Sequence, residues 1–152
     1  MDNRMTRKTV LGFVALGAIF TGISHGADLP TGSVELKGKH FSVELAKDSA
    51  SQEQGLMFRD VMSADHGMLF VFPDATRQTF WMKNTHISLD IFYFDASRKL
   101  VNVQQRVPPC LSNDNNCPLY PSTGAAQYVL ELNGGSAEKL GVKPGDELTI
   151  HQ

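Results

Sequence analysis

The sequence has no surplus of positive charge. Lysine and arginine together number 14, against 16 aspartate and glutamate residues, and the formal net charge is −2. Residues 1–26 carry three basic residues and one acidic residue, so the remainder has a net charge of −4 (−2 minus +2). Nucleic-acid binding needs a basic face that neutralises phosphates, and anionic lipid surfaces attract basic segments. We therefore expect no nucleic-acid partner and no binding to an anionic membrane surface. After cleavage of the N-terminal signal described below, we also expect no stable membrane insertion.

Cysteine is also scarce. Cys110 and Cys117 are the only two cysteines. Two thiols are too few for a structural zinc site unless histidines help, and no histidine lies at ligand spacing from them. In an oxidising compartment we expect a disulfide that closes a loop of eight residues. A free or redox-active pair and a metal site are the alternatives.

The usual marks of nucleophilic and copper sites are missing as well. Neither Cys110 nor Ser122 has a neighbouring histidine or the context of a nucleophile elbow, so the sequence leaves catalysis undecided. Thioethers and imidazoles suit copper outside the cytoplasm, but the chain has no Met-x-x-Met or His-x-His cluster. Met68 and Met82 lie in predicted strands, where core packing is the simpler explanation. We predict no metal and no cofactor.

The one long uncharged apolar run lies at the N-terminus. Arg4, Arg7 and Lys8 precede residues 9–23, which carry no charge, and small residues follow at 24–27. These are the three parts of a secretory signal. A helix that crosses a bilayer needs about 20 apolar residues, whereas this run has 15; an uncleaved anchor is the alternative. We predict a signal peptide over residues 1–26 and a periplasmic or secreted mature protein.

The rest of the chain has the pattern of one β-rich domain, residues 33–152, after a short linker at 27–32. Alternating or continuous apolar residues predict strands at 34–36, 41–45, 67–72, 77–83, 89–94, 100–103, 127–132 and 147–150. Short helices are expected at 48–54 and 136–140, each stopped by a glycine. Residues 108–124, rich in proline, predict a structureless loop held by the disulfide. About eight strands and two short helices, without a βαβ rhythm, favour a mostly antiparallel β-sandwich or small barrel.

Six stretches together resemble one known family. They are 55–59 (GLMFR), 67–70 (GMLF), 80–85 (FWMKNT), 89–91 (LDI), 129–133 (VLELN) and 141–146 (GVKPGD). In this order they are similar to the family catalogued as domain of unknown function 192, over nearly the whole mature chain. The resemblance implies a compact β-sandwich-like domain that is often exported. It implies no activity and no catalytic residue.

Acidic and basic residues interrupt three apolar segments. Arg59 either receives a carboxylate or phosphate of a ligand, or pairs with an internal acid such as Asp60, Asp90 or Glu131. Asp90 interrupts an apolar strand and must either face solvent or be paired, with Arg59 or Lys83 as the expected partner. Glu131 poses the same question, and simple outward alternation along its strand explains it.

The segment 80–85 is the best candidate for a site. Strand ends and the loops after them present polar groups on a rigid scaffold, so Trp81 can offer an apolar platform while Lys83 and Asn84 bind an anion or a sugar-like polyol. In the alternative, Trp81 belongs to the core and Asn84 makes a turn. We expect the site where the Arg59 segment, this strand end and the disulfide loop converge. Its ligand-binding candidates are Arg59, Trp81, Lys83, Asn84, Asp90 and Tyr120.

The expected function is binding. These features indicate an exported soluble domain that binds a small molecule or a component of the cell envelope. The alternative is a hydrolase-type enzyme that acts on envelope polymers or small metabolites. A structural or protein-interaction role is a third hypothesis, and an exposed apolar patch would be its sign. The sequence specifies neither the ligand nor the oligomeric state.

Overall fold

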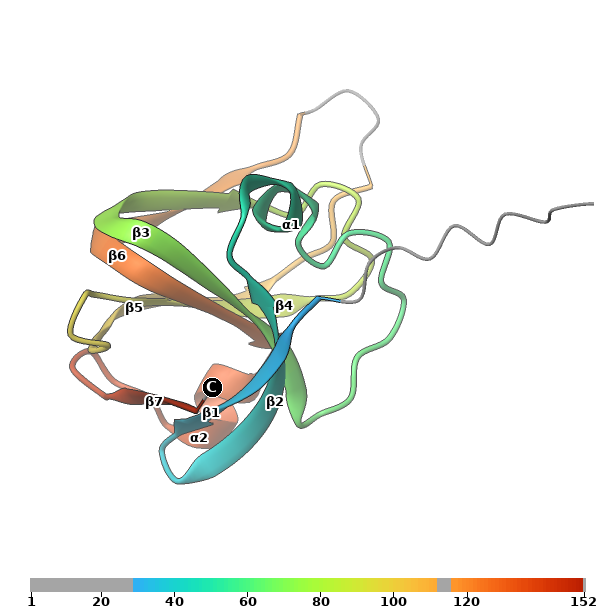
Figure 1. Ribbon diagram of the computed structural model, residues 1–152. Helices are drawn as coiled ribbons and strands as arrows, with labels where there is room; N and C mark the ends of the chain where they lie inside the picture. Colours follow the sequence, from blue (N-terminus) through green and yellow to red (C-terminus); the bar gives the residue numbers. More distant parts are fainter. Residues whose placement is uncertain (1–28, 112–115, 152) are drawn as a thin grey trace, which may run out of the picture.

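The computed structural model describes residues 29–111 and 116–151. The predicted signal peptide lies outside these ranges, as do residues 112–115 of the predicted disulfide loop. The described chain forms seven strands and two short helices (Figure 1): β1 (Thr31–Leu36), β2 (Lys39–Ala46), α1 (Ser49–Gln54), β3 (His66–Trp81), β4 (Leu89–Phe94), β5 (Leu100–Val107), β6 (Leu119–Asn133), α2 (Ser136–Leu140) and β7 (Leu148–His151). β1 starts within the predicted linker 27–32, so the ordered domain begins slightly earlier than expected.

All seven strands belong to one curled, mixed sheet with the order β5-β4-β6-β3-β2-β1-β7. Neighbouring strands are antiparallel except β2 and β3, which run parallel. The two edge strands approach each other where Leu100 N–H donates to the Asp146 carbonyl (2.8 Å) and Leu148 N–H donates to the Arg98 carbonyl (2.9 Å). The mostly-β class and the two short helices are confirmed. The prediction of an antiparallel sandwich or small barrel of about eight strands is corrected to a mixed half-barrel of seven strands in the described chain.

Two strands are much longer than predicted. β3 has 16 residues and continues through Pro73-Asp74, where the sequence predicted its end. β6 has 15 residues and begins at Leu119, inside the predicted loop 108–124. The two strands pair as a long ribbon with register shifts at 71–76 and 77–79. Bulges of this kind tolerate proline because the residue concerned need not donate to the ladder. The shifts join two predicted strands into one and reduce the strand count.

The outer half of the β3–β6 ribbon is bordered by side chains. β4 pairs with β6 only from Tyr128 to Asn133. Further out, Gln104 Nε2 donates to the Pro121 carbonyl at 3.0 Å, and Thr123 N–H donates to Asn102 Oδ1 at 2.9 Å. Side-chain amides of β5 thus satisfy backbone groups of β6 that a neighbouring strand would otherwise pair.

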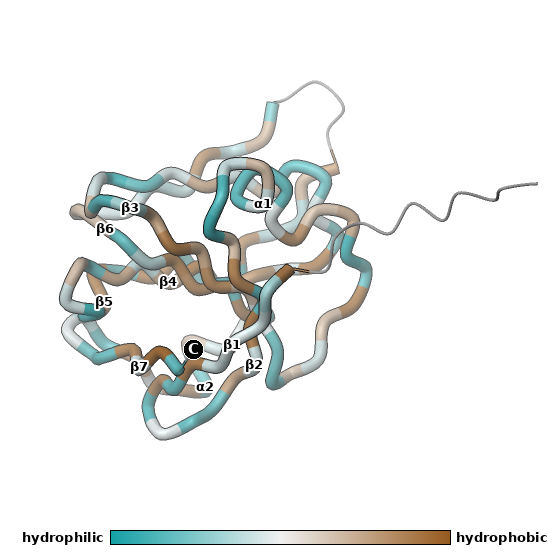
Figure 2. Tube along the Cα trace, viewed as in Figure 1, coloured by the Kyte–Doolittle hydropathy of each residue, from teal (hydrophilic) through white to brown (hydrophobic). Residues whose placement is uncertain are grey.

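The sheet is buried on both faces. The α2-side core includes Val34, Leu69, Phe92 and Leu130, with Ala137 of α2 packed among them. The α1-side core lies on the other face of the same strands and contains Met68, Phe70, Met82, Ile91 and Tyr93, together with Leu56 just beyond α1. Figure 2 shows the hydrophobic stretches along the middle of the sheet, and Figure 1 shows α1 and α2 at opposite ends of the molecule. β4 therefore has no face turned to solvent, and every one of its residues is buried.

Helix α1 has clear start and stop signals. Asp48 caps it: its carboxylate accepts the Ser51 N–H at 3.0 Å, and the Ser51 hydroxyl accepts the Asp48 N–H at 3.3 Å, which is a capping box. The helix ends at Gly55, whose φ of +48° favours glycine. The predicted helix at 48–54 is confirmed. The chain leaves it with Leu56 buried and Met57 half-buried.

Gly67 allows β3 and β6 to approach closely. A Cβ atom at this position would clash with the Glu131 carbonyl oxygen and lie 2.6 Å from the Leu132 side chain. Glycine inside a strand often marks such a close backbone approach. This contact fixes the part of β6 that carries Glu131 against β3.

The predicted disulfide between Cys110 and Cys117 is present. Cys117 is buried, whereas Leu111 and Leu119 on either side of the loop are each 64% exposed. Among the described residues, no helix is long and apolar enough to cross a bilayer.

Candidate functional site

A cleft, here called the Trp81 cleft, lies between α1 and the end of β3. It consists of three recesses that share lining residues, and Glu53 and Trp81 line all three. The inner recess has a free volume of about 30 Å³, which holds about one or two water molecules. The two outer recesses measure about 240 and 520 Å³. A narrow inner recess beside a wide mouth suits a ligand that inserts one small group and keeps its body near the surface.

The inner recess collects residues that are distant in the sequence. Four of the six stretches that resemble the known family contribute to its wall, together with the last turns of α1. Its lining residues are Gln52, Glu53, Gln54, Gly55, Leu56, Met57, Phe70, Phe80, Trp81, Lys83, Thr85 and Glu131.

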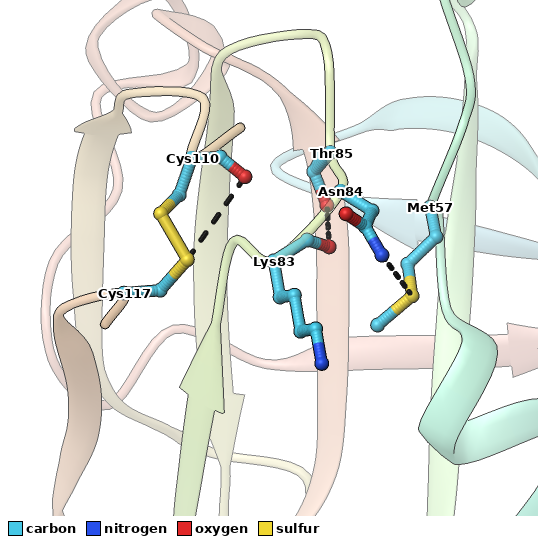
Figure 3. The surroundings of a disulfide bond; sticks show 6 residues. All are labelled: Met57, Lys83, Asn84, Thr85, Cys110 and Cys117. Atoms are coloured by element: carbon cyan, nitrogen blue, oxygen red, sulfur yellow. Dashed lines mark hydrogen bonds between the residues drawn. A yellow bond between two sulfur atoms is a disulfide. The ribbon is translucent and has the colours of Figure 1, made fainter. Parts of the chain in front are cut away.

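The turn after β3 is fixed by hydrogen bonds from both sides. Asn84 adopts a left-handed conformation with φ +53°, which costs less for asparagine than for most residues. Its carbonyl accepts the Phe58 N–H at 2.7 Å, and its N–H donates to the Cys110 carbonyl at 3.0 Å. Cys110 N–H in turn donates to the Met82 carbonyl at 3.3 Å, and Cys110 is bonded to Cys117. The disulfide segment therefore holds the turn in place (Figure 3).

Trp81 and Lys83 form the wall of the cleft at this turn. The Lys83 ammonium lies 5.1 Å from the centroid of the Trp81 ring, a cation–π contact. Trp81 is 37% exposed and Met82 only 1%, so the ring faces the cleft while its neighbour enters the core. In Figure 3 the Lys83 side chain points away from the disulfide, and the Asn84 amide points toward Met57, whose sulfur it contacts at 4.0 Å.

Glu131 brings an acid into the inner recess. Val129 belongs to the α1-side core, and Leu130 and Leu132 belong to the α2-side core, so alternation points Glu131 toward α1. It is 3% exposed, and its carboxyl accepts no hydrogen bond from any residue the structure describes. Since no fully buried side-chain oxygen of the described chain lacks a partner, the carboxyl oxygens must open onto the recess.

Burial raises the pKa of Glu131 to about 8, because the low-dielectric surroundings disfavour the carboxylate. The carboxyl is therefore largely protonated at neutral pH and can donate a hydrogen bond. The pKa of Tyr93 is also raised, first by burial and then by the nearby charge of Glu131. The Tyr93 hydroxyl donates instead to the Tyr120 carbonyl at 2.6 Å, so it does not satisfy the acid.

Arg59 lies outside the cleft and is engaged in an ion pair. Its guanidinium donates to both carboxylate oxygens of Glu44, at 2.6 and 3.0 Å, and His66 lies 3.0 Å from the same carboxylate. Burial alone would raise the pKa of Glu44, but the hydrogen bonds from Arg59 and His66 outweigh it and the pKa falls below its ordinary value. One of the two hypotheses for Arg59 was an ion pair with an internal acid. The pair is present, but the acid is Glu44 instead of Asp60, Asp90 or Glu131.

Asp90 lies on the other face of the sheet. One carboxylate oxygen accepts the Arg106 N–H at 2.6 Å, and the other accepts the Ala137 N–H at 2.7 Å, at the start of α2. Asp90 is 0% exposed. The expected pairing with Arg59 or Lys83 is wrong, because alternation along β4 points the side chain toward the α2-side core. Its role is to join β5 and α2 to β4, and the fold does not bring it to the cleft.

Tyr120 lies beside the cleft without lining any of its described recesses. It pairs with Phe80 across the β3–β6 ribbon and packs against the α1-side core. Of the six predicted ligand-binding residues, the fold brings three together in the cleft: Trp81, Lys83 and Asn84.

Sequence reasoning missed Glu131, which was expected to face solvent. The missing information was that the sheet is covered on both faces around residues 129–132, which leaves this part of β6 no outward side. Glu53 and Thr85, which also line the inner recess, were missed too. The one available signal was the position of Glu131 in the VLELN stretch and of Thr85 in FWMKNT, both part of the family resemblance.

Two solved structures are similar to this chain. The chain is similar to a crystal structure from Sinorhizobium meliloti 1021, described as a "putative transcription regulator", with 34% identity and a TM-score of 0.75 over 83% of this chain and 98% of that one. It is also similar to a protein of unknown function from Novosphingobium aromaticivorans DSM 12444, with 37% identity and a TM-score of 0.69 over 79% of this chain and 83% of that one. No curated protein matches. The DUF192 family model, described as "Uncharacterized ACR", matches residues 32–150, and the chain belongs to this family.

Proposed function

We propose that this protein is an exported binding protein whose ligand enters the Trp81 cleft. The observation that carries the proposal is the carboxyl group of Glu131, which is buried at the inner recess without a hydrogen-bond partner in the described chain. The carboxyl oxygens open only onto this small recess, where a ligand group can form a hydrogen bond with them. A hydrogen bond of this kind contributes about 0.5–1.5 kcal/mol, so the recess favours a polar occupant.

The residues around Glu131 define the chemistry of the ligand. The protonated carboxyl donates a hydrogen bond, and Lys83 adds a positive charge at the same recess. Both favour an oxygen-bearing group, such as a carboxylate, carbonyl or hydroxyl. The Trp81 ring and the apolar side chains at the mouth suit an apolar or sugar-like body. Small metabolites and fragments of envelope components have this combination.

Export is the second part of the proposal. Its supports are the N-terminal pattern of residues 1–26 and a disulfide, which persists in oxidising compartments. Fractionation of cells tests it directly. We expect the protein in the periplasm or medium with Ala27 as its first residue, and recovery of the full-length chain from the cytosol would contradict it.

Trp81 is the only tryptophan of the chain, so its fluorescence reports on the cleft. We would titrate the protein with the low-molecular-weight fraction of an envelope extract and with acetate and N-acetylglucosamine as defined probes. We expect a saturable change in emission. Lys83→Ala should weaken binding about tenfold or more, since hydrogen bonds to charged groups contribute about 1.5–3 kcal/mol. Glu131→Leu removes the neutral donor and should weaken binding about two- to tenfold, since a neutral hydrogen bond contributes about 0.5–1.5 kcal/mol.

The matched control is Lys99→Ala. Lys99 is an exposed lysine in an ion pair with Glu147, and it lines none of the described recesses. Its variant should bind like the native protein. If no probe changes the emission, or if all variants respond equally, the cleft is not the binding site.

One observation favours the hydrolase alternative. A carboxyl with a pKa of about 8 in an apolar recess has the property of a general acid. The test is turnover of envelope polymers or ester substrates by the native protein, with loss in Glu131→Gln. Ligand binding without any turnover would support the binding function and contradict the hydrolase alternative.

The description of the Sinorhizobium protein raises DNA binding as another function. Here the mature chain has a net charge of −4, which gives no electrostatic basis for phosphate binding. Binding of duplex DNA at low salt would overturn this part of the proposal.

A further inference from the structure

Three potential metal ligands meet on the outer surface of β1, β2 and β7. They are the Glu35 carboxylate and the imidazoles of His40 and His151, and one ligand atom from each lies within 4.8 Å of the others. His40 Nε2 is 3.5 Å from Glu35 Oε2, and the two imidazole centroids are 6.1 Å apart. This Glu-His-His cluster lies away from α1 and shares no residue with the Trp81 cleft (Figure 1).

The strand register brings these residues together. Glu35 of β1 lies directly opposite His40 of β2, and on the other side of β1 Ser33 lies opposite His151 of β7. Side chains two residues apart on a strand share a face, so Glu35 and His151 are diagonal neighbours. The alternate residues of these strands, including Val34, are buried, which leaves the three ligands on the solvent side.

The ligand set suits a first-row divalent ion. Two imidazoles and one carboxylate bind zinc or copper, whereas calcium and magnesium prefer oxygen ligands alone. Around an ion with bonds of about 2.1 Å, two ligand atoms are at most about 4.2 Å apart. The present separations need only small rotations, and the His40 and Glu35 side chains are 68% and 36% exposed and free to make them.

Nearby positive charges do not fill the cluster. Lys37 in the β1–β2 turn pairs with Asp146 at 3.3 Å. Lys39 lies over the Phe41 ring, 5.0 Å from its centroid. A bound dication would therefore meet the carboxylate of Glu35 without a competing ion pair from either lysine.

We propose that Glu35, His40 and His151 bind a divalent transition-metal ion such as Zn²⁺, with water completing its coordination. Three protein ligands and an open position make this a different kind of site from a four-ligand structural zinc. It also differs from the other two histidine–carboxylate contacts among residues 29–111 and 116–151, His66–Glu44 and His86–Asp60, each of which has a single imidazole.

The test is a titration of the untagged full chain, purified without a histidine tag, with Zn²⁺ alone. We expect one ion per chain with a micromolar dissociation constant. His40→Ala and His151→Ala each remove one ligand and should each weaken binding about tenfold or more. A tenfold change in the dissociation constant corresponds to 1.4 kcal/mol of binding free energy. His86→Ala is the matched control, an exposed histidine beside a carboxylate, and should bind like the native chain.

A second measurement does not depend on variants. On addition of Zn²⁺, the imidazole NMR signals of His40 and His151 should shift together and those of His86 should not. Binding weaker than millimolar would overturn the proposal. So would equal affinity in all four proteins, or a shift at His86 that matches those at the cluster.

Discussion

Two acids, Asp90 and Glu131, lie on neighbouring strands of the same sheet and are almost equally buried, yet their surroundings are opposite. Asp90 is 0% exposed and Glu131 3%, and in the register of β4 and β6 their positions are one residue apart. Asp90 accepts two backbone N–H groups, whereas Glu131 accepts none from the described chain. Both carboxylate oxygens of Asp90 are occupied by backbone N–H groups. The Glu131 carboxyl opens onto the inner recess instead, so burial alone does not tell whether an acid has its hydrogen bonds satisfied within the described chain.

The largest expected effect is on the Asp90 side. Asp90→Ala leaves the Arg106 and Ala137 N–H groups buried without an acceptor, at about 1–3 kcal/mol each. We expect a loss of about 3–5 kcal/mol in the free energy of unfolding, measured in urea at pH 7. Asp74→Asn, an exposed acid of β3, serves as the control and should change stability by less than about 0.5 kcal/mol. A similarly small effect of Asp90→Ala would remove the contrast.

The next effect is on the Glu131 side and depends on pH. The pKa of Glu131 rises from 4.5 to about 8 on folding, so the native state binds the proton more tightly. The contribution of Glu131 to the free energy of unfolding is then fully present below about pH 4.5. It is lost as the pH rises toward about 8, by at most about 1.4 kcal/mol per pH unit.

Glu131→Gln removes this titration. We expect the variant to be more stable than the native protein at pH 8–9, by on the order of 2–4 kcal/mol, and similar to it at pH 4–5. Calorimetric melting temperatures across this range provide the measurement. Parallel profiles for the two proteins would show that Glu131 is not the group responsible.

Apart from a global loss of stability, loss of the disulfide should affect only the Glu131 side of the comparison. Replacement of Cys110 and Cys117 by serine opens the loop and should lower stability by about 2.5 kcal/mol on the chain-entropy model. Because Cys110 holds the Asn84 turn, hydrogen exchange of the Asn84 amide should accelerate. The Ala137 amide on Asp90 should exchange as before, apart from the global loss. Equal acceleration at both amides would mean that the disulfide acts on the fold as a whole.

The smallest stability effect belongs to Lys83. Lys83→Ala removes a cation–π contact at a partly exposed ring, which contributes about 0.5–1 kcal/mol. The melting temperature should fall by only about 2–4 °C, while the emission of Trp81 shifts because its ring loses the ammonium. A large destabilisation would place Lys83 with Asp90 as a structural residue.

Several elements could be predicted from the sequence because their signals are local. The β1–β2 hairpin follows from alternation, α1 from its cap and glycine stop, and the disulfide from the only cysteine pair. Core packing of Met68 and Met82, predicted from their places in strands, is confirmed.

The rest depends on contacts between distant segments. Nothing near Pro73 shows that a register shift carries β3 through the proline, and nothing near Leu119 shows that β6 begins there. The partner of Arg59 is 15 residues away on a strand that runs parallel to β3. The burial of Glu131 depends on the cover over its face of the sheet, so alternation gave the correct face but not its burial.

The outer part of the β3–β6 ribbon has a consequence for self-association. A strand edge with unpaired backbone groups is a template on which another chain can add and start aggregation. Here Asn102 and Gln104 occupy backbone groups of β6 with their own amides, and Pro121 offers no N–H. The ribbon can therefore extend beyond the core without presenting that stretch of β6 as an open edge to a second molecule.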